Sequence, residues 1–174
     1  MGRPDLGVGG FEIRRLAPAD ARDFHRLRLE GFALQTREFR YAPADEERLT
    51  PKEIEARLLR DFVVGAFCED ELVGIGGLSR GVGCKIAHKA LLFGMYLRRE
   101  YRGSGIADAL MSALLDEARR TVEIVTLTVM SGNAPAVGFY RRWGFESYGI
   151  EPRAVKEDGL YFDEMLMSLS LAGG

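Results

Sequence analysis

The spacing of apolar and polar residues changes repeatedly along the chain and divides it into short predicted elements. Alternating apolar and charged side chains, as over Phe11–Leu16, are typical of a half-buried strand. Apolar residues that recur at helical spacing, as at Ile106, Leu110 and Leu114, indicate one buried face of a helix. Continuous apolar runs bounded by turn residues, as in Phe62–Cys68, indicate a buried strand.

These patterns predict a series of strands and helices joined by short turns. Glu69-Asp70 is a turn signal that joins two strands into a hairpin, and residues 36–49 form a polar, aromatic loop between the first two helices. Thr50-Pro51-Lys52-Glu53 combines a capping box with proline at the first helical position. The predicted strands are 11–16, 62–68, 72–78, 89–97, 124–129, 145–150 and 161–171, and the predicted helices are 19–31, 51–60, 105–120 and 134–143.

The order of these elements is β-α-α-β-β-β-α-β-α-β-β, which corresponds to an α+β or mixed-sheet domain. A chain of 174 residues suits one domain, which we expect over 11–171, after a flexible, glycine-rich N-terminus over 1–10. Three glycines, Gly74, Gly76 and Gly77, interrupt the predicted strand 72–78. Glycines inside a strand favour close packing or a bulge.

Composition narrows the possible settings and partners. The apolar fraction of 47% and charged fraction of 29% are those of a soluble globular protein, and a net charge of -2 argues against a nucleic-acid partner. With two cysteines and two histidines, the chain suits neither a disulfide framework nor a metal site, so we expect no metal and a cytoplasmic location. Cys68 is expected to be a core residue. No run is long enough to span a membrane, and the N-terminus does not resemble a secretory signal.

The most informative segment places an apolar strand, a basic turn and a helix start in succession. The turn reads Arg102-Gly103-Ser104-Gly105-Ile106-Ala107. Glycines let backbone N–H groups approach an anion closely, and the first turn of a helix has unsatisfied N–H donors. The turn therefore suits a pyrophosphate, although it matches neither the Walker-type loop nor Gly-x-Gly-x-x-Gly. From the glycines alone, a tight strand-to-helix turn is an equally good interpretation.

A second motif lies one helix and one strand further along the chain. Arg102, Gly105 and Ala107 match the cofactor motif Arg/Gln-x-x-Gly-x-Gly/Ala, and Asn133, Ala136, Phe139-Tyr140 and Gly144-Phe145 match the second signature in order. In both motifs and in their spacing, the sequence resembles the GNAT family of acyl-CoA N-acyltransferases. The segments His88-Lys89-Ala90, Glu151-Pro152-Arg153-Ala154 and Gly159–Met165 resemble a bacterial subgroup of that family whose acceptors are mostly unassigned.

The resemblance implies a GNAT-like fold and an N-acetyltransferase activity that uses acetyl-CoA. The implied fold is a twisted, mostly antiparallel sheet of about seven strands, splayed between strands four and five and flanked by about four helices. The pantetheine arm of CoA would lie in the splay and its pyrophosphate on the glycine-rich turn. The implied cofactor-binding residues are Met95, Tyr96, Leu97, Arg102, Gly103, Ser104, Gly105, Ile106, Ala107, Asn133, Ala136, Phe139 and Tyr140.

The resemblance also implies a direct attack of an amine on the thioester. The backbone N–H of Leu97 would polarise the thioester carbonyl, and Tyr140 would protonate the leaving thiolate as general acid. Each signature residue also has a structural interpretation: Asn133 is a preferred helix cap, and Tyr140 is a candidate half-buried aromatic. Gly138, inside the last predicted helix, is open to two explanations, an approach to the cofactor or tight packing.

The general base is less clearly indicated, because the fourth strand has no carboxylate of the kind that some family members carry there. The candidates are Glu38, His88 and Glu164, each of which is more often a solvated residue than a base, and a water chain is an equally good alternative.

The residues expected to form the acceptor pocket are compatible with several classes of amine. In the family the acceptor pocket is usually shaped by two loops, here Phe39–Pro43 and Glu151–Phe162, whose aromatic and charged residues permit a small amine, an amino acid or a peptide N-terminus. The competing interpretations are a CoA-binding regulatory domain without turnover and a nucleotide binder that prefers ATP or NAD. A homodimer is expected to be possible, since dimers are common in the family.

Overall fold

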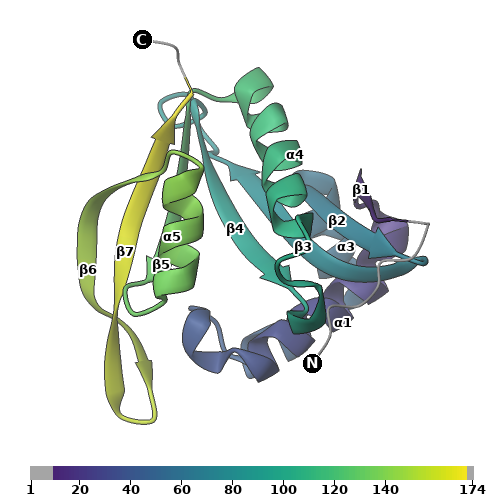
Figure 1. Cartoon of the computed structure of the whole chain (residues 1–174), viewed down its shortest axis with the longest axis horizontal. Coiled ribbons are helices and arrows are strands. Elements are labelled where there is room, and N and C mark those ends of the chain that lie inside the picture. Colours follow the sequence, from purple (N-terminus) through teal and green to yellow (C-terminus); the bar gives the residue numbers. More distant parts are fainter. Residues whose placement is uncertain (1–9, 172–174) are drawn as a thin grey trace.

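The computed structural model describes residues 10–171, and seven strands form one sheet at its centre (Figure 1). The expectation for the N-terminal residues 1–9 therefore lies outside the described part. The strand order is β1-β2-β3-β4-β5-β7-β6, with every neighbouring pair antiparallel except β4 and β5. The strands are β1 (Glu12–Arg15), β2 (Phe62–Cys68), β3 (Glu71–Arg80), β4 (Lys89–Leu97), β5 (Ile124–Met130), β6 (Glu146–Glu157) and β7 (Leu160–Ser170).

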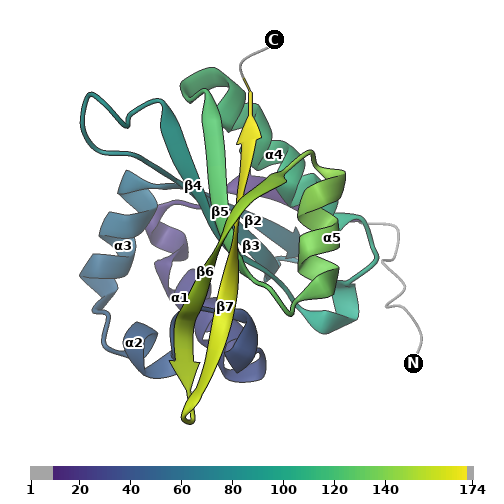
Figure 2. The same cartoon turned by 90° about the vertical axis from the view of Figure 1, so that its left-hand side faces the viewer.

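Helices cover both faces of the sheet, with α1, α2 and α3 on one side and α4 and α5 on the other (Figure 2). One apolar core lies under α4, and a second is built from α1, α3 and the strands they cover. The α-helices are α1 (Ala21–Leu34), α2 (Pro43–Glu47), α3 (Pro51–Arg60), α4 (Ile106–Thr121) and α5 (Ala134–Arg142), and the 3-10 turns are η1 (Pro18–Asp20), η2 (Thr36–Glu38) and η3 (Arg99–Tyr101).

Local chemistry explains where several elements begin. Thr50 Oγ1 accepts a hydrogen bond from the amide of Glu53, and Glu53 Oε2 accepts one from the amide of Thr50 at 2.7 Å, which confirms the predicted capping box of α3. Strands β2 and β4 have the predicted bounds. Cys68 is confirmed as a core residue, with 6% of its surface exposed.

Two predicted segments differ from the structure. The loop over 36–49 contains the short helix α2, which starts at Pro43 because Asp45 Oδ2 accepts the amide proton of Ala42 at 2.9 Å. The predicted strand 145–150 continues to Glu157, through two register irregularities. β6 and β7 therefore form one long hairpin that turns at Asp158-Gly159, where both residues have positive φ.

The sheet opens between β4 and β5. Only three residues of each strand pair, Lys89–Leu91 with Ile124–Thr126, and beyond them the strands separate. Register irregularity between β3 and β4 coincides with Gly94, which has φ +64. A Cβ added at Gly77 would come within 2.5 Å of the Phe93 ring, so the β3 glycines make room for side chains of β4. The structure thus confirms both expectations for the β3 glycines: close packing against β4, and an irregularity in the pairing of the two strands.

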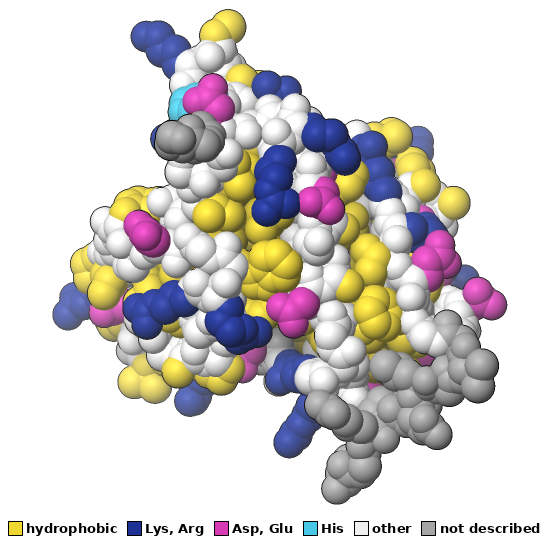
Figure 3. Space-filling model, turned by 45° about the horizontal axis from the view of Figure 1, so that its top comes forward, with side chains coloured by type: hydrophobic (Ala, Val, Ile, Leu, Met, Phe, Trp, Pro, Cys, Tyr) yellow, Lys and Arg dark blue, Asp and Glu magenta, His cyan; other side chains and the backbone are white. Residues whose placement is uncertain are grey.

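The face of the molecule drawn in Figure 3 has no region where charges of one sign gather. Basic and acidic side chains are interspersed there, in keeping with the net charge of -2. The longest helix between residues 10 and 171 is α4, with 16 residues, and no helix in that range has the length and apolar run needed to cross a bilayer.

Candidate active site

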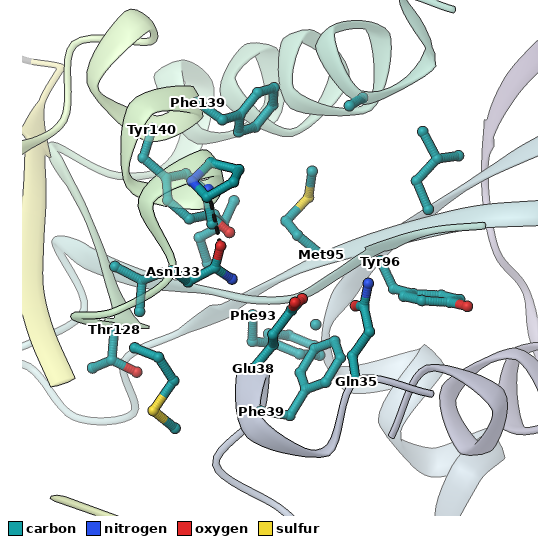
Figure 4. A pocket seen from close by; sticks show the side chains of 18 of the residues that line it. Gln35, Glu38, Phe39, Phe93, Met95, Tyr96, Thr128, Asn133, Phe139 and Tyr140 are labelled. Carbon is teal, nitrogen blue, oxygen red and sulfur yellow. Dashed lines mark hydrogen bonds between the residues drawn. The ribbon is translucent and has the colours of Figure 1, made fainter. Parts of the chain in front are cut away.

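A cleft of about 530 Å³ occupies the opening between β4 and β5. Its walls come from both faces of the sheet: α4 and α5 form one side, and the segment from the end of α1 to the start of α2 forms the other (Figure 4). The lining residues are Gln35, Glu38, Phe39, Arg40, Tyr41, Leu91, Leu92, Phe93, Gly94, Met95, Tyr96, Leu97, Arg102, Gly103, Ala107, Leu110, Thr128, Val129, Met130, Asn133, Pro135, Ala136, Phe139, Tyr140 and Glu164.

The glycine-rich turn lies at one end of the cleft and leads directly into α4. Gly103 and Gly105 have φ of 74° and 89°, a left-handed conformation that glycine adopts without steric cost. A Cβ at Gly105 would meet no atom within 4 Å, so the turn is open on its outer side. The first N–H groups of α4 have no acceptor inside the helix. The amide of Ile106 donates to Ser104 Oγ at 3.4 Å. The turn thus combines open space on its outer side with the positive end of a helix dipole, a combination that suits an anion.

The side chains of the turn have distinct local roles. Ser104 Oγ donates to the Tyr101 carbonyl oxygen at 2.5 Å, so the hydroxyl is already engaged in shaping the turn. The side chain of Ile106 is fully buried in the core, which leaves only its backbone to face a ligand. Arg102 lines the cleft, and its Nε lies 3.4 Å from the Leu97 carbonyl oxygen.

The edge of β4 exposes backbone groups to the opening. The amide of Arg98 donates to the Val73 carbonyl at 3.0 Å, toward β3. Because successive amides of a strand point to opposite edges, the N–H of Leu97 points away from β3 and toward the cleft. The Tyr96 side chain points away from the cleft, and its hydroxyl donates to Glu30 at 3.1 Å. Burial, reinforced by the charge of Glu30, raises the pKa of Tyr96 to about 12.

Asn133 and Tyr140 approach the cleft from the α5 side (Figure 4). Asn133 Oδ1 accepts a hydrogen bond from the amide of Ala136 at 3.2 Å, which confirms the helix-cap interpretation and leaves the side-chain NH2 group as a donor. Tyr140 makes edge-to-face contacts with Phe139 and Phe145, at centroid distances of 5.6 and 5.9 Å. Burial raises the pKa of Tyr140 to about 12, so its phenol keeps its proton at neutral pH.

Among the three base candidates, Glu38 and Glu164 line the cleft, whereas His88 does not. In Figure 4, the Glu38 carboxylate points from η2 into the space between Asn133 and the β4 residues Phe93 and Met95. His88 precedes β4 at the end where the two strands are still paired, and its carbonyl accepts the amide proton of Glu123 at 2.8 Å. The structure therefore brings Glu38, Asn133 and Tyr140 together and leaves His88 outside this group.

Glu164 is buried and held by Arg40, an arrangement that the sequence pattern did not predict. The Arg40 guanidinium donates to Glu164 and, at 3.1 Å, to Glu151 of the neighbouring strand. Its hydrogen bonds to Glu164 raise the pKa of Arg40. This ion pair ties the loop after η2 to the β6–β7 hairpin, so the two predicted acceptor loops meet at one point.

A second buried ion pair supports the bulge of β4. Arg28 on α1 donates to Glu46 on α2 at 2.6 and 3.0 Å. Burial opposes ionisation of Glu46, but the hydrogen bonds and charge of Arg28 outweigh it and lower the pKa of that carboxyl. A Cβ at Gly94 would lie 2.9 Å from Arg28 Nη1, so this guanidinium packs against the bulge. Neither residue stands out in the sequence, where Arg28 is one of several charges of the first predicted helix and Glu46 lies in the predicted loop over 36–49.

The residues between 10 and 171 contain no group of three His, Cys, Asp or Glu side chains arranged to hold a metal ion. The site that the structure assembles is thus an open-edged strand, a glycine-rich turn at a helix start, a protonated phenol and a facing carboxylate.

Comparison with known proteins agrees with this architecture. The L-methionine sulfoximine/L-methionine sulfone acetyltransferase of Pseudomonas paraeruginosa PA7 is 35% identical over 78 residues, which are 44% of this chain and 45% of that protein. The chain thus spans less than half the length of this curated relative. The acetyltransferase of the GNAT family from Streptococcus pneumoniae superposes with a TM-score of 0.82 at 23% identity, covering 92% of this chain and 98% of the other.

A further solved structure contains the expected co-substrate. It is yncA, a putative acetyltransferase from Salmonella typhimurium with acetyl-CoA, which superposes with a TM-score of 0.81 at 20% identity over 95% of this chain and 96% of the other. The sequence profile of the Acetyltransferase (GNAT) family matches residues 24–145, the span that contains β4, the glycine-rich turn, Asn133 and Tyr140. The chain therefore belongs to the GNAT acetyltransferase family.

Proposed function

We propose that this protein transfers an acetyl group from acetyl-CoA to a primary amine of a small molecule, an amino acid, or a peptide or protein N-terminus. The observation that carries the proposal is the cleft itself. It is lined by the glycine-rich turn and by β4 opposite Asn133, and Tyr140 and Glu38 approach it from opposite faces of the sheet. In this proposal the turn holds the pyrophosphate and the backbone of β4 holds the pantetheine arm. A CoA thioester needs these groups in this order along its length.

In the proposed reaction the amine nitrogen attacks the thioester carbonyl carbon directly. The carbon–nitrogen bond forms, the carbon–sulfur bond breaks, and the N–H of Leu97 stabilises the negative charge on the carbonyl oxygen. Tyr140, protonated at neutral pH because its pKa is about 12, donates its proton to the leaving thiolate. The products are the N-acetyl amide and CoA with a free thiol.

The attacking amine must lose a proton, and we assign its acceptance to Glu38, directly or through water. Glu38 is the carboxylate that faces the cleft without an arginine partner in the described residues, whereas Glu164 is held by Arg40. A carboxylate already bound by a guanidinium is a poor base, because its lone pairs are occupied.

Thiol release from acetyl-CoA across a panel of amines, with mass spectrometry of the product, tests the proposal. We expect acetylation of at least one primary amine. Glu38→Gln should lower kcat about 100-fold while acetyl-CoA affinity stays within about twofold. Glu47→Gln, an exposed glutamate on α2 outside the cleft, is the matched control and should keep the wild-type rate. Tight binding of acetyl-CoA without transfer to any amine would instead indicate a CoA-binding regulatory domain.

The proposal extends to the setting of the protein. Both cysteines are free, and Cys84 is exposed, which suits the reducing cytoplasm of a bacterium. We propose that acetyl-CoA and the amine are its partners, without nucleic acid or membrane, and that the chain forms a homodimer. Light scattering during size-exclusion chromatography measures that oligomeric state directly.

A further inference from the structure

The acceptor end of the cleft has apolar walls. Phe39 and Phe93 both line the cleft, near Glu38 in Figure 4. Leu91, which is 44% exposed, continues the apolar surface along β4. Phe39 is held by edge-to-face contacts with Phe32 and Tyr96, at centroid distances of 5.0 and 6.5 Å. Phe93 is held against the backbone of Gly77. These rings form fixed walls that suit a hydrocarbon or aromatic body.

The charged groups at the same end carry a negative balance. Three carboxylates, Glu38, Glu164 and Glu151, lie at this end, and Arg40 is the guanidinium that binds two of them, Glu164 and Glu151. Glu164 is almost fully buried, so its charge is poorly screened by solvent. The result is a net charge of minus two beside an apolar wall, which attracts a cation with an apolar body.

Arg40 is already occupied by carboxylates of the protein. Its Nε and Nη2 atoms donate to Glu164, and Nη2 also reaches Glu151. The other arginine that lines the cleft is Arg102, and the side-chain amide of Gln35 lies between it and Glu38. Arg37 lines an adjoining hollow together with Glu38 and pairs with Glu157. A carboxylate next to the attacking nitrogen would therefore meet Glu38, while the arginines around it are already bound by groups of the protein.

From this arrangement we propose that the acceptor is an alkyl- or aralkylamine whose amine-bearing carbon carries no carboxylate, rather than a free α-amino acid. The inference rests on the proposed function and names the substrate class of the same site. Its ammonium group is attracted by the carboxylates at the acceptor end, its body lies against Phe39, Phe93 and Leu91, and Glu38 takes the proton that makes the nitrogen nucleophilic.

Three acceptors with the same aromatic body test the inference: phenethylamine, L-phenylalanine and L-phenylalaninamide. We expect kcat/KM for phenethylamine and the amide to agree within about tenfold. The value for phenylalanine should be lower by about 100-fold or more, because its carboxylate is placed beside like charges. Equal or preferred use of phenylalanine would overturn the inference while leaving the acetyltransferase proposal intact. Bound acetyl-CoA without transfer to phenethylamine would also contradict it.

Charge removal provides a second test on the folded protein. Glu151→Gln changes a half-exposed side chain, and it should lower the preference for phenethylamine over phenylalanine by about three- to fivefold. Glu146→Gln changes an exposed glutamate at the start of β6, outside the cleft and outside the ion pairs of the described residues. It is the matched control and should leave that preference unchanged. An unchanged preference in Glu151→Gln would contradict the electrostatic part of the inference. Acetyl-CoA affinity should be the same in both variants.

Discussion

Asn133 Oδ1 lies 3.2 Å from the amide nitrogen of Ala136 and caps α5, so the orientation of this side chain is set before any ligand arrives. The cap uses the oxygen and leaves the NH2 group as the half of the amide that can donate to the pantetheine arm. One side chain thus has a structural role and a proposed binding role that different atoms perform, and substitutions can separate them.

Asn133→Asp should retain the cap, since aspartate is an equally good N-cap acceptor, but it removes the donor. We expect stability within about 0.5 kcal/mol of wild type and acetyl-CoA affinity lower by about tenfold, roughly the loss of one hydrogen bond. Asn133→Ala should lose affinity and also about 1 kcal/mol of stability. Calorimetric titration and urea unfolding measure the two effects. Wild-type affinity in the aspartate variant would confine Asn133 to capping.

Tyr140→Phe should lower turnover far more than acetyl-CoA affinity. The phenyl ring keeps its contacts with Phe139 and Phe145 but has no proton to donate. Loss of a general acid reduces kcat by about 100-fold or more, whereas the dissociation constant should stay within about threefold. Single-turnover kinetics with saturating acetyl-CoA give the relevant rate. A variant as fast as wild type would show that the thiolate takes its proton from elsewhere.

The raised pKa values of Tyr96 and Tyr140 predict a specific loss of stability in base. Both are about 12 in the folded protein, because burial disfavours the phenolate, against about 10 in the unfolded chain. Their contribution is fully present below pH 10 and is lost as the pH rises toward 12, where only the unfolded state ionises readily. Chemical denaturation across this range should show the decline, and Tyr140→Phe should reduce it. An equally steep decline in that variant would contradict the assignment.

Gly105→Glu should weaken acetyl-CoA binding by about 100-fold or more, because it sets a carboxylate against the pyrophosphate and places a side chain at φ +89. Gly159→Glu, in the β6–β7 turn, is the charge-matched control: Gly159 has φ +79, a Cβ there also meets nothing within 4 Å, and the residue does not line the cleft. This control should bind acetyl-CoA normally. Gly105→Asn, which tolerates positive φ better and has no charge, should fall between the two. Normal affinity in a folded Gly105→Glu protein would exclude the turn as the pyrophosphate site.

The parts of the site that were predictable from sequence are those whose chemistry is local. Thr50 and Glu53 cap α3 within four residues, and Gly103 and Gly105 shape their turn with neighbours along the chain. Asn133 precedes the helix it caps. In each case the interacting groups are close in sequence, so a short pattern contains the whole interaction.

The parts that were not predictable depend on residues far apart in the chain. Arg40 and Glu164 are separated by 124 positions, and Arg28 and Glu46 by 18. In the sequence these four residues cannot be distinguished from ordinary surface charges, because only the fold brings the partners together. The extension of β6 beyond residue 150 was not predicted for a different reason. Pro152 and Arg153 interrupt the strand pattern, and Arg153 has φ +55. Pairing with β7 nevertheless resumes at Val155.

The short pairing of β4 with β5 means that the opening passes through the sheet instead of ending on it. The side of the cleft proposed for CoA is bounded by α4 and α5, and the side proposed for the acceptor by η2 and the loop that follows. In this arrangement neither molecule has to leave for the other to enter. A short linker could join the sulfur of CoA to the nitrogen of an apolar amine. This single bisubstrate ligand would pass through the opening and occupy both sides. It would gain affinity from both faces of the protein at once.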